Sequence, residues 1–470
     1  MHKKLWLVAA LAIALAGCSR AKTATSVLGD AQEAMGNPTS IQYAGTGVDG
    51  FFGQAINAGQ EWPRRELSAY TRAINFDQRS AREELTFAQP TFGGQQQNTQ
   101  VNGDKAWNVG ANGPAPQLAA AEERQLGIWL TPHGFVKGAM AAGNATLTEM
   151  EGASLISFTA LGKYKVDGTL DAMNLVTKVE TTIASPVLGD VPLVATYSDY
   201  KDFSGVQFPA TIAIEQGGFS VRELTVTSVT PNAPLDLPVP ENVQSATVPP
   251  VQVVSAMLAP GVWHLTGGSH HSVVVDLTDG IAVIEAPLTE ERSLAVIAEA
   301  KKLVPNKPIR YLLTTHHHFD HTGGLRTYVA EGATIVTHQS NVPYFEKAAV
   351  APATLVPDMQ AKSPKTPTFQ GVAEKTVIGD AKQMIELYPT SGDLHTGEYT
   401  LIYLPRPRIL VEADAFSPGP ADAPPPPMPP PNAVTLYDQV QTLKLNVGTI
   451  APIHGRGAVP MAELRRFIGR

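Results

Sequence analysis

The sequence is poor in cysteine and in charge. Cys18 is the only cysteine among 470 residues, so no intramolecular disulfide can form. Charged residues make up 17% of the chain, the formal net charge is −8, and no run of basic residues is concentrated anywhere. Nucleic acid is therefore not an expected partner. The hydrophobic content of 43% leaves ample apolar material for folded cores.

The first residues have the pattern of an export signal. Lys3 and Lys4 precede the apolar stretch 5–16, which is too short to cross a bilayer as a stable helix. The stretch ends in Leu-Ala-Gly-Cys18, which resembles the bacterial lipobox, where the cysteine is lipidated. An ordinary secretory signal with an incidental cysteine is the alternative. Because Ser19 follows Cys18, as in lipoproteins sent to the outer membrane, we expect lipid anchoring there, facing the periplasm of a two-membrane bacterium.

The length suits two domains. We expect a signal peptide at 1–18, a tether at 19–38, a β-rich first domain at 39–236, a proline-rich linker at 237–250 and a second domain at 251–470.

Antiparallel strands are expected in the first domain. Residues 175–183, 193–200 and 219–229 alternate polar and apolar positions, as half-exposed strands do. Residues 93–101, with three consecutive glutamines, are expected to form a polar loop, and residues 119–130 a helix. This half of the chain resembles the curved half-barrel of periplasmic lipoprotein carriers.

A second proline-rich stretch lies at residues 418–431 and includes four consecutive prolines. Such a run should adopt the extended polyproline conformation. It falls between Asp414 and His454, two candidate metal ligands. We therefore interpret it as a semi-rigid wall or lid beside the metals, with a plain spacer as the alternative.

The most informative run is His-His-His-Phe-Asp-His at residues 316–321, directly after the apolar segment 309–315. Imidazoles and a carboxylate crowded this closely are costly to desolvate unless a cation lies between them. A polar loop that binds metals opportunistically is the alternative. Since alternate side chains of an extended segment face opposite sides, His316 and His318 should point together. His317 should then pack elsewhere or support the ligands from behind.

Three further candidate ligands lie at the ends of apolar segments. His395 stands in a loop between two strand-like segments, Asp414 closes a third, and His454 follows a fourth. Layered α/β folds place their sites where strands end. Four such positions together predict a metalloenzyme.

This order of ligands resembles that of the metallo-β-lactamase superfamily: His-x-His-x-Asp-His, then His, then Asp, then Pro-x-His-Gly. The resemblance covers residues 251–470 and implies a four-layer αβ/βα sandwich for the second domain. It also implies two metal sites, one held by His316, His318 and His395, the other by Asp320, His321 and His454, with Asp414 bridging them.

The chemistry implied is hydrolysis. Two divalent ions can share a bridging water and lower its pKa to near neutrality, so that the bridging hydroxide attacks the substrate. Asp320 would then be a metal ligand and also the catalytic residue that orients this nucleophile and carries a proton to the leaving group. Histidine and carboxylate ligands suit zinc, manganese or iron, and the resemblance favours two Zn²⁺. A mononuclear iron site, as in the related persulfide dioxygenases, is the alternative.

The absence of further cysteines also bears on the substrate. Two of the three zinc β-lactamase classes use a cysteine where Asp414 stands, and this chain has none to supply there. In this respect the chain is more similar to hydroxyacylglutathione hydrolases, lactonases and phosphodiesterases. It departs from the family at Ala413, where glycine is frequent, which puts the bridging role of Asp414 in question.

Some histidines outside the motifs also receive predictions. His270 and His271 lie in a loop that borders the site in relatives, and we interpret them as substrate contacts, with ordinary loop residues as the alternative. His338 follows an expected strand and is interpreted as structural or as supporting the ligands from behind.

The favoured function is a zinc-dependent hydrolase that cleaves an ester, lactone, thioester or related bond in a small molecule. A non-catalytic binding or carrier lipoprotein is the alternative from another class, although a decayed site would be expected to have lost ligands. A β-lactamase and an iron dioxygenase are further alternatives within the superfamily.

Overall fold

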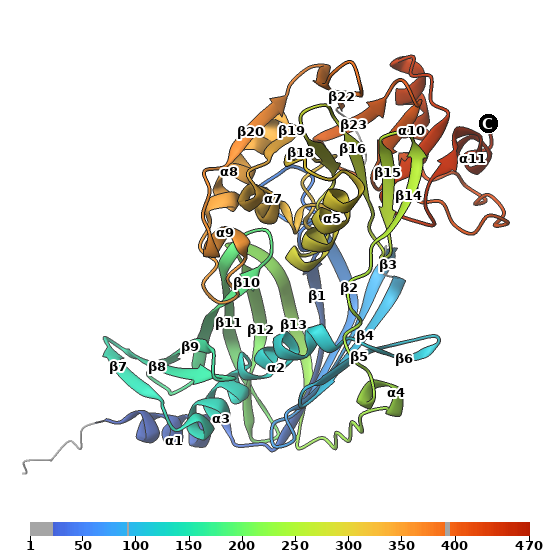
Figure 1. Ribbon diagram of the computed structural model, residues 1–470. Coiled ribbons are helices and arrows are strands. Elements are labelled where there is room, and N and C mark those ends of the chain that lie inside the picture. Colours follow the sequence, from blue (N-terminus) through green and yellow to red (C-terminus); the bar gives the residue numbers. More distant parts are fainter. Residues whose placement is uncertain (1–21, 92–93, 391–394) are drawn as a thin grey trace, which may run out of the picture.

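The computed structural model describes residues 22–91, 94–390 and 395–470. The predicted signal peptide and Cys18 lie outside these ranges. Within them, no helix has both the length and the apolar character needed to cross a membrane. The strands up to β13 form one body and those from β14 onward form another, which lies above it in Figure 1.

One antiparallel sheet of 13 strands forms the N-terminal domain. Its order is β6-β5-β4-β3-β2-β1-β13-β12-β11-β10-β9-β8-β7, so that the first strand pairs with the last. The strands are β1 (Ser40–Gly50), β2 (Arg64–Asn75), β3 (Ser80–Thr91), β4 (Gly94–Asn102), β5 (Lys105–Gly110), β6 (Gly113–Pro116), β7 (Thr146–Met150), β8 (Ala153–Ala160), β9 (Tyr164–Asp171), β10 (Val176–Ser185), β11 (Gly189–Phe203), β12 (Val206–Gln216) and β13 (Phe219–Pro231). The predicted antiparallel β-rich domain is confirmed.

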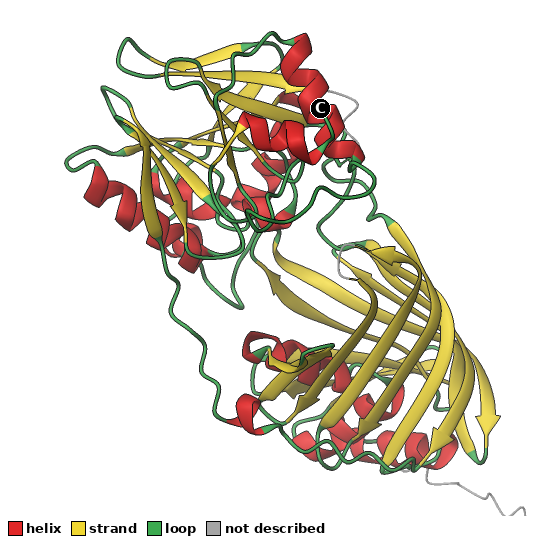
Figure 2. Cartoon of the chain, turned by 90° about the vertical axis from the view of Figure 1, so that its right-hand side faces the viewer, coloured by secondary structure: helices red, strands yellow, loops and turns green. Residues whose placement is uncertain are grey.

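The sheet curves around the helices of this domain (Figure 2). These are α1 (Ala24–Met35), α2 (Ala121–Trp129) and α3 (Pro132–Ala142), with the short 3₁₀ helix η1 (Leu118–Ala120) before α2. Thr131 caps α3 by accepting a hydrogen bond from the N–H of Gly134, and Pro132 begins the helix. Apolar side chains of the helices and of the concave sheet face form a single core, in which Phe135 is fully buried.

Two local predictions for this domain are wrong. Residues 24–35 of the expected tether form α1, which buries Val27, Leu28 and Met35 in the core. Small residues between these apolar positions obscure their helical spacing in the sequence. Residues 94–101 of the expected loop belong to β4, which pairs with β3 and β5. Most of β4 is partly exposed, so glutamines are tolerated there without the usual alternation.

The connection between the domains runs along the outside of the molecule (Figure 2). It contains one helical turn, α4 (Glu241–Gln244), which packs near β5 and β6. At its start, Leu235 and Leu237 bury against Ala73 of the sheet. The first part of the connection is thus fixed to the N-terminal domain.

Two sheets packed face to face form the C-terminal domain. The first has the order β14-β15-β16-β17-β18-β19-β20 and the second β21-β22-β23-β24-β25-β26. Their strands are β14 (Val254–Ala259), β15 (Val262–Thr266), β16 (Ser272–Asp276), β17 (Ile281–Ile284), β18 (Ile309–Leu313), β19 (Thr334–His338), β20 (Thr368–Val372), β21 (Thr376–Gly379), β22 (Met384–Thr390), β23 (Tyr399–Leu404), β24 (Ile409–Glu412), β25 (Thr449–Pro452) and β26 (Val459–Pro460).

Helices cover both outer faces of this sandwich. On the first sheet they are α5 (Glu290–Leu303), α7 (Leu325–Glu331) and α8 (Val342–Val350), and on the second α10 (Pro431–Thr442) and α11 (Met461–Phe467). The shorter helices are α6 (Phe319–Thr322), η2 (Gln339–Asn341) and α9 (Met359–Lys362). Val273 and Val275 face the second sheet while Val274 faces the helices, so the three central residues of β16 are all apolar. The predicted four-layer αβ/βα sandwich is confirmed.

Within the residues that the structure describes, the domains contact each other at two places. The segment after α8 binds the start of β11, where the Asp190 carboxylate accepts from the N–H and hydroxyl of Thr354 at 2.7 and 2.6 Å. Leu355 of the same segment packs against the N-terminal core. The second contact is made by residues 51–63, between β1 and β2, and lies at the candidate metal centre.

Replacing Leu28 with alanine tests whether α1 is part of the N-terminal core. Removing this buried side chain should lower the free energy of unfolding by about 2–5 kcal/mol, because a cavity remains. Glu33→Ala, on the exposed side of the same helix, should change it by about 0.5 kcal/mol or less. Chemical denaturation measures both, and equal stability of the two variants would mean that residues 24–35 are a loose tether after all.

Candidate metal centre

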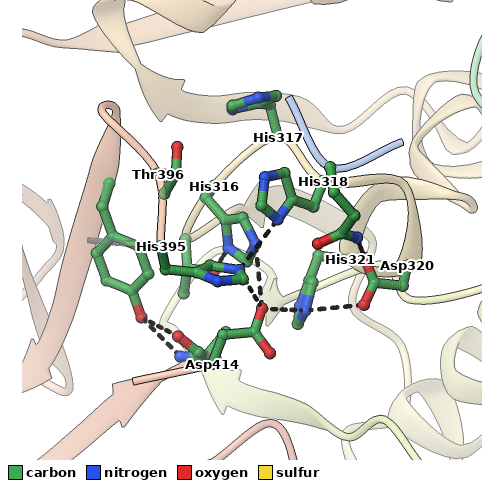
Figure 3. A network of polar contacts seen from close by, with 12 residues as sticks. His316, His317, His318, Asp320, His321, His395, Thr396 and Asp414 are labelled. Atoms are coloured by element: carbon green, nitrogen blue, oxygen red, sulfur yellow. Dashed lines mark hydrogen bonds and ion pairs between the residues drawn. The ribbon is translucent and has the colours of Figure 1, made fainter. Parts of the chain in front are cut away.

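The predicted ligands converge at one edge of the sandwich, where several strands end (Figure 3). His316 and His318 follow β18, and Asp320 and His321 lie on α6. The remaining three come from the second sheet and its loops: His395 between β22 and β23, Asp414 after β24, and His454 after β25.

The one-turn helix α6 is held in place by the connection between β17 and α5. The N–H of Ala286 donates to the His321 carbonyl, and the N–H of Leu288 donates to that of Asp320. Gly323 follows the helix, and a Cβ there would lie 1.9 Å from the carbonyl oxygen of Leu288. Only glycine permits this close approach, which sets the orientation of Asp320 and His321.

Two groups of side chains have ligand atoms within 4.8 Å of one another. The His316 group consists of His316, His318, His395 and Asp414, and the Asp320 group consists of His270, Asp320, His321 and His454. The structure therefore brings all seven predicted ligands together and adds His270.

Asp414 lies between the two groups. Its Oδ2 is 2.9 Å from Nε2 of His395 and 2.9 Å from Nε2 of His321, while its Oδ1 is 2.8 Å from Nε2 of His454. A carboxylate in contact with both groups is placed as a bridging ligand must be. Its backbone is left-handed, with φ of +61°, a conformation that aspartate adopts more readily than most residues. Ala413, the departure from the family pattern, fits there fully buried.

Hydrogen bonds to atoms outside the groups fix which nitrogen of His318 and of His321 faces inward. Nε2 of His318 donates to the carbonyl of Ala55 at 2.9 Å, which leaves the lone pair on Nδ1. Nδ1 of His321 likewise donates to the Glu285 carboxylate at 2.8 Å and leaves the lone pair on Nε2. The inward atoms are therefore acceptors, as metal ligands must be.

The inward nitrogen atoms lie closer together than two lone pairs would by themselves, as is expected where a cation binds between them. Nδ1 of His318 lies 3.0 Å from Nε2 of His395, and Nε2 of His321 lies 3.2 Å from Nε2 of His454. Nε2 of His316 is fully buried and lies 3.2 Å from Oδ2 of Asp414, the oxygen that His321 and His395 also contact. Lone pairs this close repel unless a proton or a metal lies between them, so the donor set suits divalent ions such as zinc.

Burial favours the neutral form of His316 and His318, whereas the carboxylates of Asp414 and Glu285 outweigh burial at His321 and raise its pKa well above the usual value. Burial lowers the pKa of His316 well below the usual value and lowers the pKa of His318 to about 3. Burial alone would raise the pKa of Asp414, but the surrounding imidazoles outweigh it and hold that pKa well below the usual value. Neutral histidines and ionised carboxylates are the forms that bind metals.

Comparison with known proteins agrees with this geometry. A family model described as the metallo-beta-lactamase superfamily matches residues 265–454. The C-terminal domain belongs to the metallo-β-lactamase superfamily. The predicted membership of that superfamily is thus confirmed for this domain.

Similar proteins match this chain over less than half of its length and at low identity. The 2,4-dinitroanisole O-demethylase subunit alpha of Nocardioides sp. (strain JS1661) is 23% identical over 159 residues, which are 34% of this chain and 45% of that protein, less than half its length. Solved structures of a metallo-beta-lactamase from Pontibacter korlensis and of one from Hirschia baltica each match 46% of this chain. The match spans 98% of the Pontibacter korlensis protein, with 19% sequence identity and a TM-score of 0.35. It spans 96% of the Hirschia baltica protein, with 17% identity and a TM-score of 0.34.

Glu285 is a site residue of the metallo-β-lactamase domain that sequence analysis missed. It follows β17, is fully buried, and accepts hydrogen bonds from the N–H of Thr315 at 2.6 Å and from His321. Its φ of +70° is unusual for a glutamate and costs about 1–3 kcal/mol. The available signal was a glutamate directly after four apolar strand residues, where burial of an unpaired charge would be prohibitive.

The paired histidines of the loop before β16 have different environments. Nε2 of His270 lies 3.1 Å from Asp320 Oδ2, so it belongs to the Asp320 group. His271 is only 2% exposed, turns toward His264, and has Nδ1 3.3 Å from the Pro452 carbonyl. The predicted substrate contact of His271 is wrong, because its neighbour takes the position facing the metal centre.

Two other histidines support the domain. His317 points away from the metal groups (Figure 3) and donates from Nε2 to the Ala55 carbonyl at 2.9 Å. Nδ1 of His338 accepts from the N–H of Ser340 at the start of η2. Both have the structural or supporting positions that the sequence indicated.

The proline-rich stretch begins beside the last ligand. The carbonyl of Pro418 accepts from the N–H of Arg456 at 3.3 Å, and that of Gly419 accepts from Nε of the same arginine at 2.7 Å. Residues 418–419 therefore lie against the loop that follows His454. The role of residues 418–431 as a wall or lid stays a prediction.

Alanine substitutions of the neighbouring His270 and His271 separate their roles. His270→Ala should weaken the ion of the Asp320 group at least about tenfold, because a side chain with its nitrogen directed at that group is lost. His271→Ala should lower thermal stability but keep the metal content. Metal analysis after dialysis against a chelator measures the difference, and equal retention in both variants would remove His270 from the ligand set.

Proposed function

We propose that the metallo-β-lactamase domain is a hydrolase that uses two zinc ions to cleave a small ester, lactone, thioester or related bond. The observation that carries this proposal is the position of Asp414, whose two oxygens contact ligands of both groups. Two complete sets of ligands sharing a carboxylate favour a dinuclear centre over a mononuclear iron site.

Bound in this way, divalent ions supply Lewis acidity and lower the pKa of water to near neutrality. The protein's own residues supply the orientation. The contacts of Glu285 and Ala55 hold the imidazoles of His321 and His318 in one tautomer. The ligand positions are therefore set before a substrate arrives, which reduces the reorganisation needed during the reaction.

Asp320 is the residue we assign to proton transfer. Its side chain is 32% exposed, twice the value of 16% for Asp414, so it is the carboxylate better placed to meet a substrate. Burial raises its pKa, but the hydrogen bond with His270 and the nearby His321 outweigh this and lower the pKa below the usual value. An ionised Asp320 can accept a proton from the nucleophile and pass it to the leaving group.

Anchoring by lipid at Cys18 is a separate part of the proposal. It would place the enzyme on the outer membrane, where its substrates would be small molecules of the periplasm. Support comes from the sequence pattern of residues 1–18.

Metal loading and a substrate panel test the proposed hydrolase. Zinc-replete protein should contain close to two equivalents of metal and cleave at least one member of a panel of esters, lactones, thioesters, phosphodiesters and sulfates. Nitrocefin tests the β-lactamase alternative. The panel also includes methyl aryl ethers, since one relative is named as a subunit of a 2,4-dinitroanisole O-demethylase. A metal content near zero would favour the carrier lipoprotein instead.

Asp320→Ala should reduce kcat/KM on the best substrate by about 10²–10⁴-fold, because orientation of the nucleophile and proton transfer are lost together. The matched control is Asp422→Ala, which removes an exposed carboxylate of the proline-rich stretch. Steady-state kinetics on zinc-loaded protein compares them. Wild-type turnover by Asp320→Ala would refute the catalytic assignment.

A further inference from the structure

The metal centre includes a loop of the other domain. Residues 51–63 connect β1 and β2 of the N-terminal sheet, yet they contact segments that carry ligands of both metal groups. Gln54 and Asp320, which share a hydrogen bond, are 266 positions apart in the chain. We call residues 51–63 the β1–β2 loop.

The carbonyl of Ala55 supports the His316 group. It accepts from Nε2 of His318 at 2.9 Å and from Nε2 of His317 at 2.9 Å, so both of its lone pairs are used. The first of these bonds leaves Nδ1 of His318 as the inward acceptor. A main-chain atom of the N-terminal domain thus decides which nitrogen of a metal ligand is available.

The side chain of Gln54 supports the Asp320 group. Its Nε2 donates to Oδ1 of Asp320 at 2.8 Å. The other oxygen, Oδ2, is the one that lies 3.1 Å from Nε2 of His270 and 3.6 Å from Nε2 of His321. By holding Oδ1, the amide directs Oδ2 toward the position that a metal would share with these imidazoles.

The same loop also holds the segment after His395. The carbonyl of Ile56 accepts from the N–H of Gly397 at 2.8 Å and from the Thr396 hydroxyl at 3.0 Å. The N–H of Ala58 donates to the Glu398 carboxylate at 3.1 Å. Two ligand-bearing segments, the run that holds His318 and Asp320 and the segment that follows His395, are therefore joined to one loop.

Aromatic packing fixes the base of the loop against α6. The ring of Phe319 lies edge-on to Phe52 and Trp62, with centroids 5.2 and 5.6 Å apart. The N–H of Phe319 also donates to the carbonyl of Gly53 at 3.2 Å. Gly53 has φ of +79°, and a Cβ there would lie 2.8 Å from the Phe319 ring, so a side chain at this position would push the loop away.

We propose that the β1–β2 loop is a structural part of the metal centre and that Gln54 is a positioning residue for the second metal, acting through Asp320. The C-terminal domain supplies the ligands, and the N-terminal domain fixes the orientation of two of them, His318 and Asp320. The inference rests on the dinuclear centre of the proposed function but not on the reaction that this centre catalyses.

Metal titration of the full chain tests the proposal. Gln54→Ala should weaken the ion of the Asp320 group by about 10- to 100-fold, as loss of a hydrogen bond to a ligand commonly does, while the ion of the His316 group is retained. Competition with a chromophoric chelator measures both affinities. In the Co²⁺-loaded protein, the visible spectrum of Gln54→Ala should shift toward that of Asp320→Ala.

Gln60→Ala is the matched control, because Gln60 is an exposed glutamine of the same loop whose side chain contacts Asn57. It should bind both ions as the wild type does. Two wild-type affinities in Gln54→Ala, or equal loss of both ions from a variant with wild-type thermal stability, would overturn the proposal. A wild-type protein that binds two ions but hydrolyses nothing would refute the proposed function and leave this inference standing.

Discussion

The C-terminal domain is organised around ionisable groups that are buried together. Four of its six clustered histidines, His316, His318, His321 and His270, are at most 9% exposed, and Asp414 lies between the two groups. Desolvating so many polar atoms is unfavourable unless each has a partner. Hydrogen bonds to Ala55 and Glu285 satisfy the outward nitrogens of His318 and His321. The inward ligand atoms of each group lie within 4.8 Å of one another, where a cation can bind them. Metal binding and burial therefore depend on each other.

The fold offsets the unfavourable burial of these polar groups by bringing several strand ends together at one edge of the sandwich. The apolar cores between the sheets and beneath the helices fix β17, β18, β24 and β25, so the residues that follow them have little freedom. Two of those residues, Glu285 and Asp414, have left-handed backbones that cost free energy. The surrounding packing imposes these conformations, and the site gains rigidly oriented carboxylates.

The N-terminal domain contacts residues of the metal centre directly, which a separate binding module would not do. Its β1–β2 loop contacts His318 and Asp320 directly, and the segment after α8 binds the start of β11. The two contacts lie at β1 and at β11, which are separated in the sheet by β13 and β12, so the domains are joined at two separate points. This gives a physical reason why both domains occur in one chain.

The sequence by itself determined the features that depend on near neighbours: the apolar segments that form strands of the sandwich, the alternating strands of the first domain, and the spacing that places His316 and His318 on the side opposite His317. Such features follow from backbone geometry, which repeats over a few residues. Only the tertiary structure decided that His270 rather than His271 faces the centre, that Glu285 orients His321, and that Gln54 reaches Asp320. These contacts join residues from 36 to 266 positions apart, and they depend on where whole strands end in space.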